Sequence, residues 1–258
     1  MSKYSQRLQK AKRSKKSSSP NSGQSPLSGP HFQNDTIRPP TLPAEKLSSG
    51  ERQNTSSPIL REKFEGALQA QQSGQLAVAR ALYEAILLEQ PHHASTLHLL
   101  GVLHLDQGDP AKAVELIERA SAVAPQIAPF YISLATAYSR LGECEQACDA
   151  SDKAAELQPQ DVPTLLRAGL MHFKSHRRTS ANKFFQRVIA LEPNNLAALA
   201  GAAIVYEQDS KLAEAQAIID QHLSRAPGCV ALAVTAARLQ RRARQFSAAI
   251  RILDRARC

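Results

Sequence analysis

A proline recurs every 34 residues along most of this chain, and this period constrains the fold more than any other feature. The five prolines are Pro91, Pro125, Pro159, Pro193 and Pro227. An alanine column keeps the same spacing, at Ala79, Ala113, Ala147, Ala181, Ala215 and Ala249. A third column holds only Ala or Gly, at Ala67, Gly101, Ala135, Gly169, Ala203 and Ala237. A fixed period of this length predicts an array of identical supersecondary units.

Each column has a physical reason if one unit is a helix, a turn and a second helix. Apolar and small residues recur at spacings of three and four, as in Leu97, Leu100 and Gly101, which is the helical signature. A glycine, such as Gly74, falls between two such segments and supplies the turn. Each proline follows the second segment, because proline cannot continue a helix. The small columns are expected where the two helices cross, since only Gly or Ala lets the backbones approach closely.

The sequence therefore predicts an all-α fold, an α-solenoid of about six helix–turn–helix repeats after a disordered N-terminal tail. The tail is residues 1–58, and the predicted units are 60–93, 94–127, 128–161, 162–195, 196–229 and an incomplete 230–258. The sixth unit stops before its own proline column and lacks a polar cap. Either the chain is part of a longer protein, or this end docks on a partner or on another copy.

The tail carries most of the formal charge of +9. It is rich in Ser and Pro and poor in aliphatic residues, so it cannot bury enough apolar surface to offset its conformational entropy. Its basic cluster is Lys10, Lys12, Arg13, Lys15 and Lys16. Such a cluster predicts weak, salt-sensitive and nonspecific contact with polyanions. The alternative is a solubilising tail without a dedicated partner.

Two segments resemble the tetratricopeptide repeat (TPR) closely: LHLLGVLHLDQGDPAKAVELIERASAVAP at 97–125 and YISLATAYSRLGECEQACDASDKAAELQP at 131–159. The resemblance covers residues 60–258, and a period of 34 does not fit HEAT-type repeats of about 40 residues. A narrower likeness, to the N-terminal TPR regions of bacterial sulfotransferases and O-linked glycosyltransferases, rests on ALYEAILLEQPHHASTLHLLGVLHLDQGD. Nothing in the chain matches their catalytic domains.

Catalysis, cofactors and metals find no support in the sequence. No Gly-rich phosphate loop and no nucleophile with His and carboxylate at a recognisable spacing is present. Cys144 and Cys148 share a helix face, but further ligands for a metal are missing. No apolar run suggests a membrane span, and the first residues do not form a secretory signal, so a cytoplasmic location is expected.

The TPR resemblance implies that the first helix of each unit lines a concave groove where a peptide or protein segment binds. The positions expected to line it, called the inner positions below, are Phe64, Leu68 and Gln71; His98, Val102 and Leu105; Ile132, Thr136 and Ser139; Leu166, Leu170 and Phe173; Ala200, Ile204 and Glu207; and Val234, Arg238 and Arg241. They are apolar or neutral in the early and middle units and basic at the end, which suits apolar anchors. The two-carboxylate clamp for acidic chaperone tails is not expected, because Phe64, Leu68, Pro129 and Ser133 occupy its places.

Charge also differs along the turns. The turns of units two and three are acidic, with Asp106, Asp109, Glu143 and Glu145, whereas later turns carry Lys174, His176, Arg177, Arg178, Arg241, Arg242 and Arg244. The basic end is interpreted either as a dock for an acidic or phosphate-bearing partner or as an ordinary solvated face.

Three functions remain open from the sequence. The leading hypothesis is a non-enzymatic protein–protein interaction scaffold or adaptor. The alternative is the substrate-recruiting TPR region of a sulfotransferase or glycosyltransferase whose catalytic domain is absent from this chain. Binding of nucleic acid through the tail and the basic end is a third.

Overall fold

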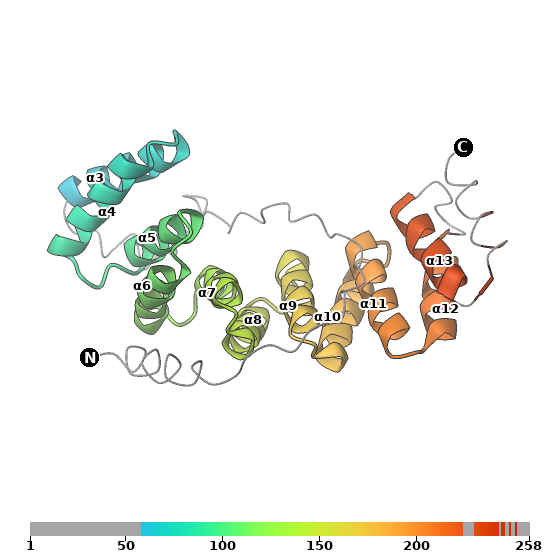
Figure 1. The fold of residues 1–258 in the computed structure, drawn as a ribbon. Helices are drawn as coiled ribbons and strands as arrows, with labels where there is room; N and C mark the ends of the chain where they lie inside the picture. Colours follow the sequence, from blue (N-terminus) through green and yellow to red (C-terminus); the bar gives the residue numbers. More distant parts are fainter. Residues whose placement is uncertain (1–57, 224–229, 243, 246–247, 249–250, 252–258) are drawn as a thin grey trace, which may run out of the picture. The chain divides into compact units, whose positions relative to one another are not determined.

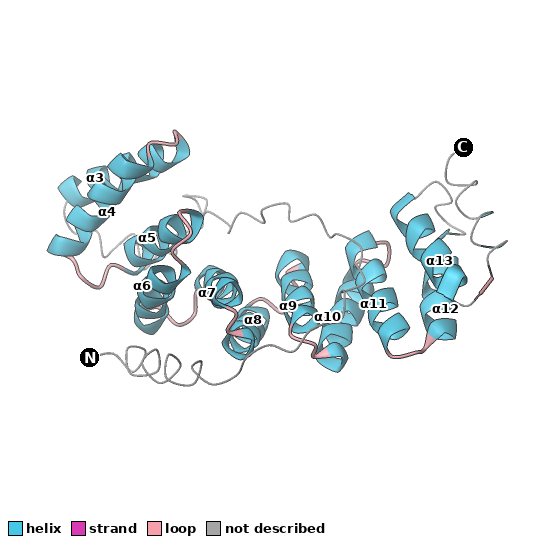
Figure 2. Cartoon of the chain, viewed as in Figure 1, coloured by secondary structure: helices cyan, strands magenta, loops and turns pink. Residues whose placement is uncertain are grey.

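The computed structural model describes residues 58–223, 230–242, 244–245, 248 and 251, and the regular elements in these ranges are all α-helices (Figures 1 and 2). The first helices of the six units are α3 (Pro58–Gln72), α5 (Ala94–Asp106), α7 (Ala128–Leu141), α9 (Val162–Lys174), α11 (Leu196–Gln208) and α13 (Val230–Arg242). The second helices of the first five units are α4 (Leu76–Glu89), α6 (Pro110–Val123), α8 (Cys144–Leu157), α10 (Arg178–Leu191) and α12 (Leu212–Leu223). The predicted all-α repeat fold is confirmed.

Two predicted features lie outside the described residues: the tail with its basic cluster, and most of the second helix of unit six. One boundary differs from the prediction, because α3 begins at Pro58, which the sequence assigned to the tail. Proline is tolerated in the first turn of a helix, where its missing N–H would have no partner.

The turn inside each unit has the same backbone geometry six times over. One residue per turn is left-handed, with φ of 76° at Gly74, 81° at Gly108, 79° at Gly142, 59° at His176, 61° at Ser210 and 61° at Arg244. Two hydrogen bonds close each turn; in the first, Gly74 N donates to Gln71 O and Gln75 N to Ala70 O. This pattern is the Schellman motif. The turn role predicted for the glycines is confirmed, and the last three units use residues that adopt this conformation at a cost.

The two helices of a unit cross at the small-residue column. A Cβ atom added to Gly101 of α5 would lie 2.6 Å from Ile117 Cγ1 and 3.3 Å from Ala113 O of α6. In unit four, the same addition to Gly169 would meet the Phe185 ring of α10 at 2.8 Å. At these two glycines the small column makes room for a bulky side chain of the second helix, and at Gly101 the backbone of α6 also lies close.

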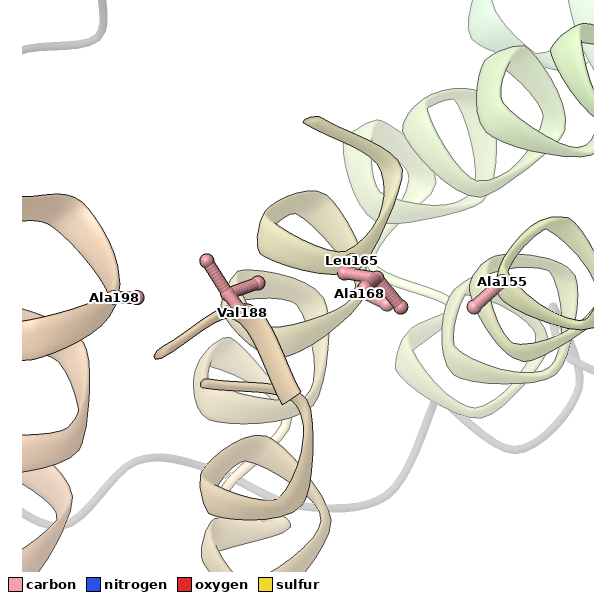
Figure 3. Close-up of a cluster of buried hydrophobic side chains, with 5 residues drawn as sticks. All are labelled: Ala155, Leu165, Ala168, Val188 and Ala198. Carbon is pink, nitrogen blue, oxygen red and sulfur yellow. The ribbon is translucent and has the colours of Figure 1, made fainter. Parts of the chain in front are cut away.

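Consecutive units share buried seams. One cluster joins four helices, with Ala155 on α8, Leu165 and Ala168 on α9, Val188 on α10 and Ala198 on α11 (Figure 3). These side chains are at most 2% exposed. No single unit could bury them, so each unit depends on its neighbours for a core.

The turns between units also hold neighbouring units together. Pro91, Pro125, Pro159 and Pro193 lie in turns just past the second helices, as predicted, while Pro227 lies outside the described residues. Two of these prolines accept hydrogen bonds from arginines of the next unit. Arg119 Nη2 donates to Pro91 O and Arg187 Nη2 donates to Pro159 O, each at 3.0 Å.

Candidate partner-binding surface

The first helices of successive units pack side by side, and three of the contacts between them join residues that are 35 apart. His98 Nε2 lies 2.9 Å from Ser133 Oγ, Arg140 donates to Leu105 O, and Arg242 Nη1 donates to Glu207 Oε1 at 3.0 Å. Residues in contact between neighbouring first helices are thus separated in sequence by one period plus one residue. Reading the sequence at this offset would have found these contacts, which the sequence analysis missed.

In unit one, the structure places two predicted inner positions in the interior of the helix pair. Phe64 is 7% exposed, and its ring centroid lies 6.4 Å from Tyr83 and 5.5 Å from His93. Gln71 is equally buried and accepts a hydrogen bond of 2.7 Å from the Tyr83 hydroxyl. Both side chains therefore pack inside unit one, and their contact with a partner stays a prediction.

Lys63 lies on another face of α3. It occupies the column that holds Leu97 in unit two and Leu165 in unit four, both of which are fully buried, and Leu165 packs on the preceding unit. The described residues contain no unit before α3 for this column to pack on. Lys63 remains partly exposed and pairs with Glu89. Leu68, the third inner position of this unit, is half-buried.

In unit two, every residue of α5 from Ala94 to Leu105 is buried. The inner positions His98, Val102 and Leu105 are therefore all buried in this structure. His98 packs its ring on Phe130, with centroids 4.7 Å apart, and burial lowers its pKa to about 3. His98 is thus held neutral between α5 and α7.

Units three and four place most of their inner positions at a partly open face. Thr136, Ser139, Leu166, Leu170 and Phe173 are half-buried, and Ile132 is buried. The α9 residues rest against a fully buried cluster that contains Phe185, Ala202 and Val205. One side of each of these apolar side chains therefore packs on the buried cluster, while part of its surface stays accessible to solvent.

The inner positions of unit five are mostly buried, whereas two of those in unit six are exposed to solvent. Ile204 and Glu207 of α11 are each 7% exposed, whereas Ala200 is half-buried. In α13, Val234 is 52% exposed and Arg241 is exposed. The open part of the predicted groove thus runs over α7, α9 and α13, with Ala200 on α11 between them.

The basic end predicted from the sequence is partly neutralised. Glu207 forms ion pairs with both Arg238 and Arg242, at 2.8 and 3.0 Å, and its carboxylate side chain is only 8% exposed. Arg238 is itself only 23% exposed. These two arginines of α13 therefore connect it to α11 through Glu207. Arg241 lies outside this cluster.

The turn of unit four is exposed and basic, as its sequence indicates. Lys174, His176, Arg177 and Arg178 are all exposed, and an open hollow of about 390 Å³ is lined by His176, Arg177, Arg178, Thr179, Ser180 and Asp209. Arg178 Nη1 lies 2.9 Å from Asp209 Oδ1 of the next turn. Arg177 approaches Glu145 at 3.6 Å, and this glutamate side chain is 80% exposed.

Other polar clusters have structural roles. His172 Nε2 lies 2.7 Å from Asp152 Oδ1, and the imidazole stacks on Phe184 with centroids 5.4 Å apart, which joins α9 to α8 and α10. Among the described residues, no three His, Cys, Asp or Glu side chains gather where they could hold a metal ion. Within the same residues, no helix has the length and apolar composition needed to cross a membrane.

Comparison with known families and structures agrees with this architecture. Two models described as "Tetratricopeptide repeat" match residues 70–130 and 128–161. No curated protein matches the chain as a relative. A tetratricopeptide repeat protein from Parabacteroides merdae ATCC 43184 superposes with a TM-score of 0.64 at 20% identity, covering 76% of this chain and 77% of that one.

Two further solved structures share the fold. MamA superposes with a TM-score of 0.59 at 21% identity, covering 64% of this chain and 90% of its own. YrrB, described as "a TPR protein with an unusual peptide-binding site", gives 0.55 at 17% identity, covering 67% and 90%. Residues 70–161 thus match the tetratricopeptide repeat, and the helix pairs repeat the same architecture along the described residues. Such repeats serve in general as protein–protein interaction scaffolds and are typically non-catalytic.

Proposed function

We propose that this chain is a non-enzymatic scaffold that binds a peptide or protein segment along the open inner positions of α7, α9 and α13. The observation that carries the proposal is the row of half-buried apolar side chains Leu166, Leu170 and Phe173 on α9. A row of apolar side chains whose surface stays partly accessible favours a partner that covers it. Their support by the cluster of Phe185, Ala202 and Val205 keeps them in place before binding.

The chemistry of this face favours a segment with apolar anchors. Thr136 and Ser139 are half-buried inner positions of α7, and Val234 is an exposed apolar inner position of α13. Hydroxyl groups can accept or donate hydrogen bonds to a backbone, while apolar side chains receive the anchors. YrrB, which shares this fold, is described as having a peptide-binding site, and this supports the class of ligand.

The alternative hypothesis, a substrate-recruiting region of a sulfotransferase or glycosyltransferase, has no comparable support. Neither the family models nor the three similar structures named above bring in a transferase. The scaffold function therefore stands as the conclusion.

The test is a selection of peptides from a random display library against the full chain, followed by affinity measurements on variants. Leu170→Lys places a charge in the apolar row. Thr136→Lys places one at a half-buried inner position of α7, where the Thr136 hydroxyl bonds only to Ile132 O of its own helix among the described residues. Leu191→Lys is the matched control, because Leu191 is 44% exposed at the end of α10, a second helix.

We expect the Leu170 and Thr136 variants to bind selected peptides at least about tenfold more weakly, with the Leu191 variant unchanged. Thermal unfolding of each variant verifies that the fold is kept. Peptides that bind all three variants as they bind the parent chain would overturn the assignment of the surface.

A further inference from the structure

The turns of units four, five and six place exposed cations along one edge of the repeat array. The residues of this edge, called the basic edge below, are Lys174, His176, Arg177, Arg178, Lys211, Arg241, Arg242 and Arg244, and all eight are exposed. Contacts on the described residues tie the three turns together. Arg178 reaches Gln208 O and Asp209 Oδ1 of unit five, and Arg242 reaches Glu207 from unit six. The edge is therefore continuous over three units.

Its positive charge is only partly balanced. Arg178 pairs with Asp209, Arg242 pairs with Glu207, and Arg177 has a longer ion pair with Glu145. Lys174, Lys211 and Arg241 make no ion pair with any carboxylate of the described residues. Several cations are thus available to an approaching anion.

The basic edge also contains the hollow at the unit-four turn, where part of a ligand could be received. The hollow opens beside the start of α10, with Thr179 and Ser180 in its lining. In unit two, the carboxylate of Asp109 caps α6 by accepting from Lys112 N. The equivalent residue of α10 is Arg177, whose side chain makes no capping hydrogen bond, and the first turn has no acidic residue. A carboxylate from outside would find uncapped amides and two hydroxyl side chains there.

We propose that the basic edge docks an acidic segment of a partner protein, on a surface that borders the inner positions and shares Arg241 with them. Single exposed ion pairs are weak, so recognition requires several in a row, and three adjacent turns supply them. Phe173, the last apolar inner residue of α9, directly precedes Lys174, so one partner can place an apolar anchor on the inner face and its acidic part on the basic edge.

A polypeptide fits this edge better than a nucleic acid does. The residues that line the hollow include no aromatic side chain of Phe, Tyr or Trp on which a base could stack. Asp209 also lies in the lining, where it pairs with Arg178 and so leaves fewer free cations for the closely spaced phosphates of a nucleic acid strand. A peptide can space its carboxylates to avoid this residue.

The experiment measures binding of a short fluorescein-labelled peptide of alternating Glu and Gly to the full chain by fluorescence anisotropy. The tail would also attract this probe, so every protein carries Gln in place of its five clustered cations, Lys10, Lys12, Arg13, Lys15 and Lys16. The test variant adds Lys174→Gln, Arg177→Gln and Lys211→Gln. The control adds Arg80→Gln, Lys112→Gln and Lys153→Gln instead, three exposed cations in other units.

The test and control variants lose the same formal charge, so a difference between them reports position. We expect the test variant to bind the acidic peptide at least about tenfold more weakly and the control by less than about twofold. Binding should weaken steeply between roughly 50 and 200 mM salt, and a Gln and Gly peptide should not bind.

Equal losses in the two variants would overturn the proposal. A short DNA duplex tested in parallel separates the two kinds of macromolecule. If the test variant loses DNA binding by as large a factor as peptide binding, or a larger one, the assignment to a protein segment is wrong. The inner-face variants Leu170→Lys and Thr136→Lys report on the proposed function independently, since neither changes the basic edge.

Discussion

The Phe185 ring is held between two glycines, and this arrangement gives a prediction with a defined sign. Phe185 of α10 is 1% exposed. A Cβ added to Gly169 of α9 would lie 2.8 Å from its ring, and one added to Gly201 of α11 would lie 2.7 Å from it. The ring cannot move away from one helix without approaching the other. Gly169→Ala should therefore overpack the crossing.

The expected magnitude follows from two opposing effects. Replacing a helical glycine with alanine favours the helix by about 1 kcal/mol. Overpacking a filled core costs about 1–3 kcal/mol. We expect Gly169→Ala to lower the free energy of unfolding by about 1–2 kcal/mol, near the upper part of the difference, because three ring atoms lie within 3.2 Å of the new atom.

Gly66 provides the matched control. It lies in α3, and an added Cβ would meet only Leu82 Cδ1, at 3.9 Å, which is an ordinary contact. Gly66→Ala should therefore stabilise the chain by up to about 1 kcal/mol through helix propensity alone. Urea unfolding followed by far-ultraviolet circular dichroism compares both variants with the parent.

A double-variant cycle identifies the ring as the cause. In a Phe185→Leu background the smaller side chain leaves room, so Gly169→Ala should lose most of its destabilising effect. The reasoning is refuted if Gly169→Ala stabilises the parent chain as Gly66→Ala does, or if its cost is unchanged beside Leu at position 185.

Three further predictions concern single residues. Ser210→Gly should stabilise by about 0.5–1 kcal/mol in thermal unfolding because Ser210 holds a φ of 61°; no gain would mean that the left-handed turn is not strained. Arg187→Ala should cost about 0.5–1.5 kcal/mol by removing the hydrogen bond to Pro159 O, and an unchanged unfolding midpoint would contradict this. Burial holds the pKa of His98 at about 3 when folded, so the unfolded chain binds the extra proton between that pH and about 6.5. Stability is therefore full above about pH 6.5 and falls toward pH 3, and His98→Gln should make the fall shallower by up to about 1.4 kcal/mol per pH unit; parallel curves would contradict this.

The sequence predicted the features that recur in every unit, because equivalent residues of each repeat form the same turn and the same helix crossing. The turn at Gly74 and the crossing at Gly101 were both readable from single columns. The left-handed residues of the last three units could have been found by continuing the glycine column by 34 residues to His176, Ser210 and Arg244. They were missed because no glycine marks them.

The candidate surface was less predictable, since it depends on how far neighbouring elements cover each first helix. Phe64 of α3 is buried against Tyr83 of α4 and His93, and the column of inner positions does not show these contacts. The pairing of Glu207 with Arg238 and Arg242 likewise closes a site that composition alone marks as basic. Both outcomes depend on contacts between neighbouring helices, which a column-by-column reading of one unit does not contain.

The central claim is that partners bind across the inner positions of the first helices, and site-specific photocrosslinking tests it most directly. A photoreactive side chain is placed at Leu170 of α9 in one protein and at Leu191 of α10 in another, each within the full chain. Irradiation with a library-selected peptide should give a covalent adduct at position 170 and none at position 191. An adduct at position 191 alone, or equal adducts at both, would contradict the account.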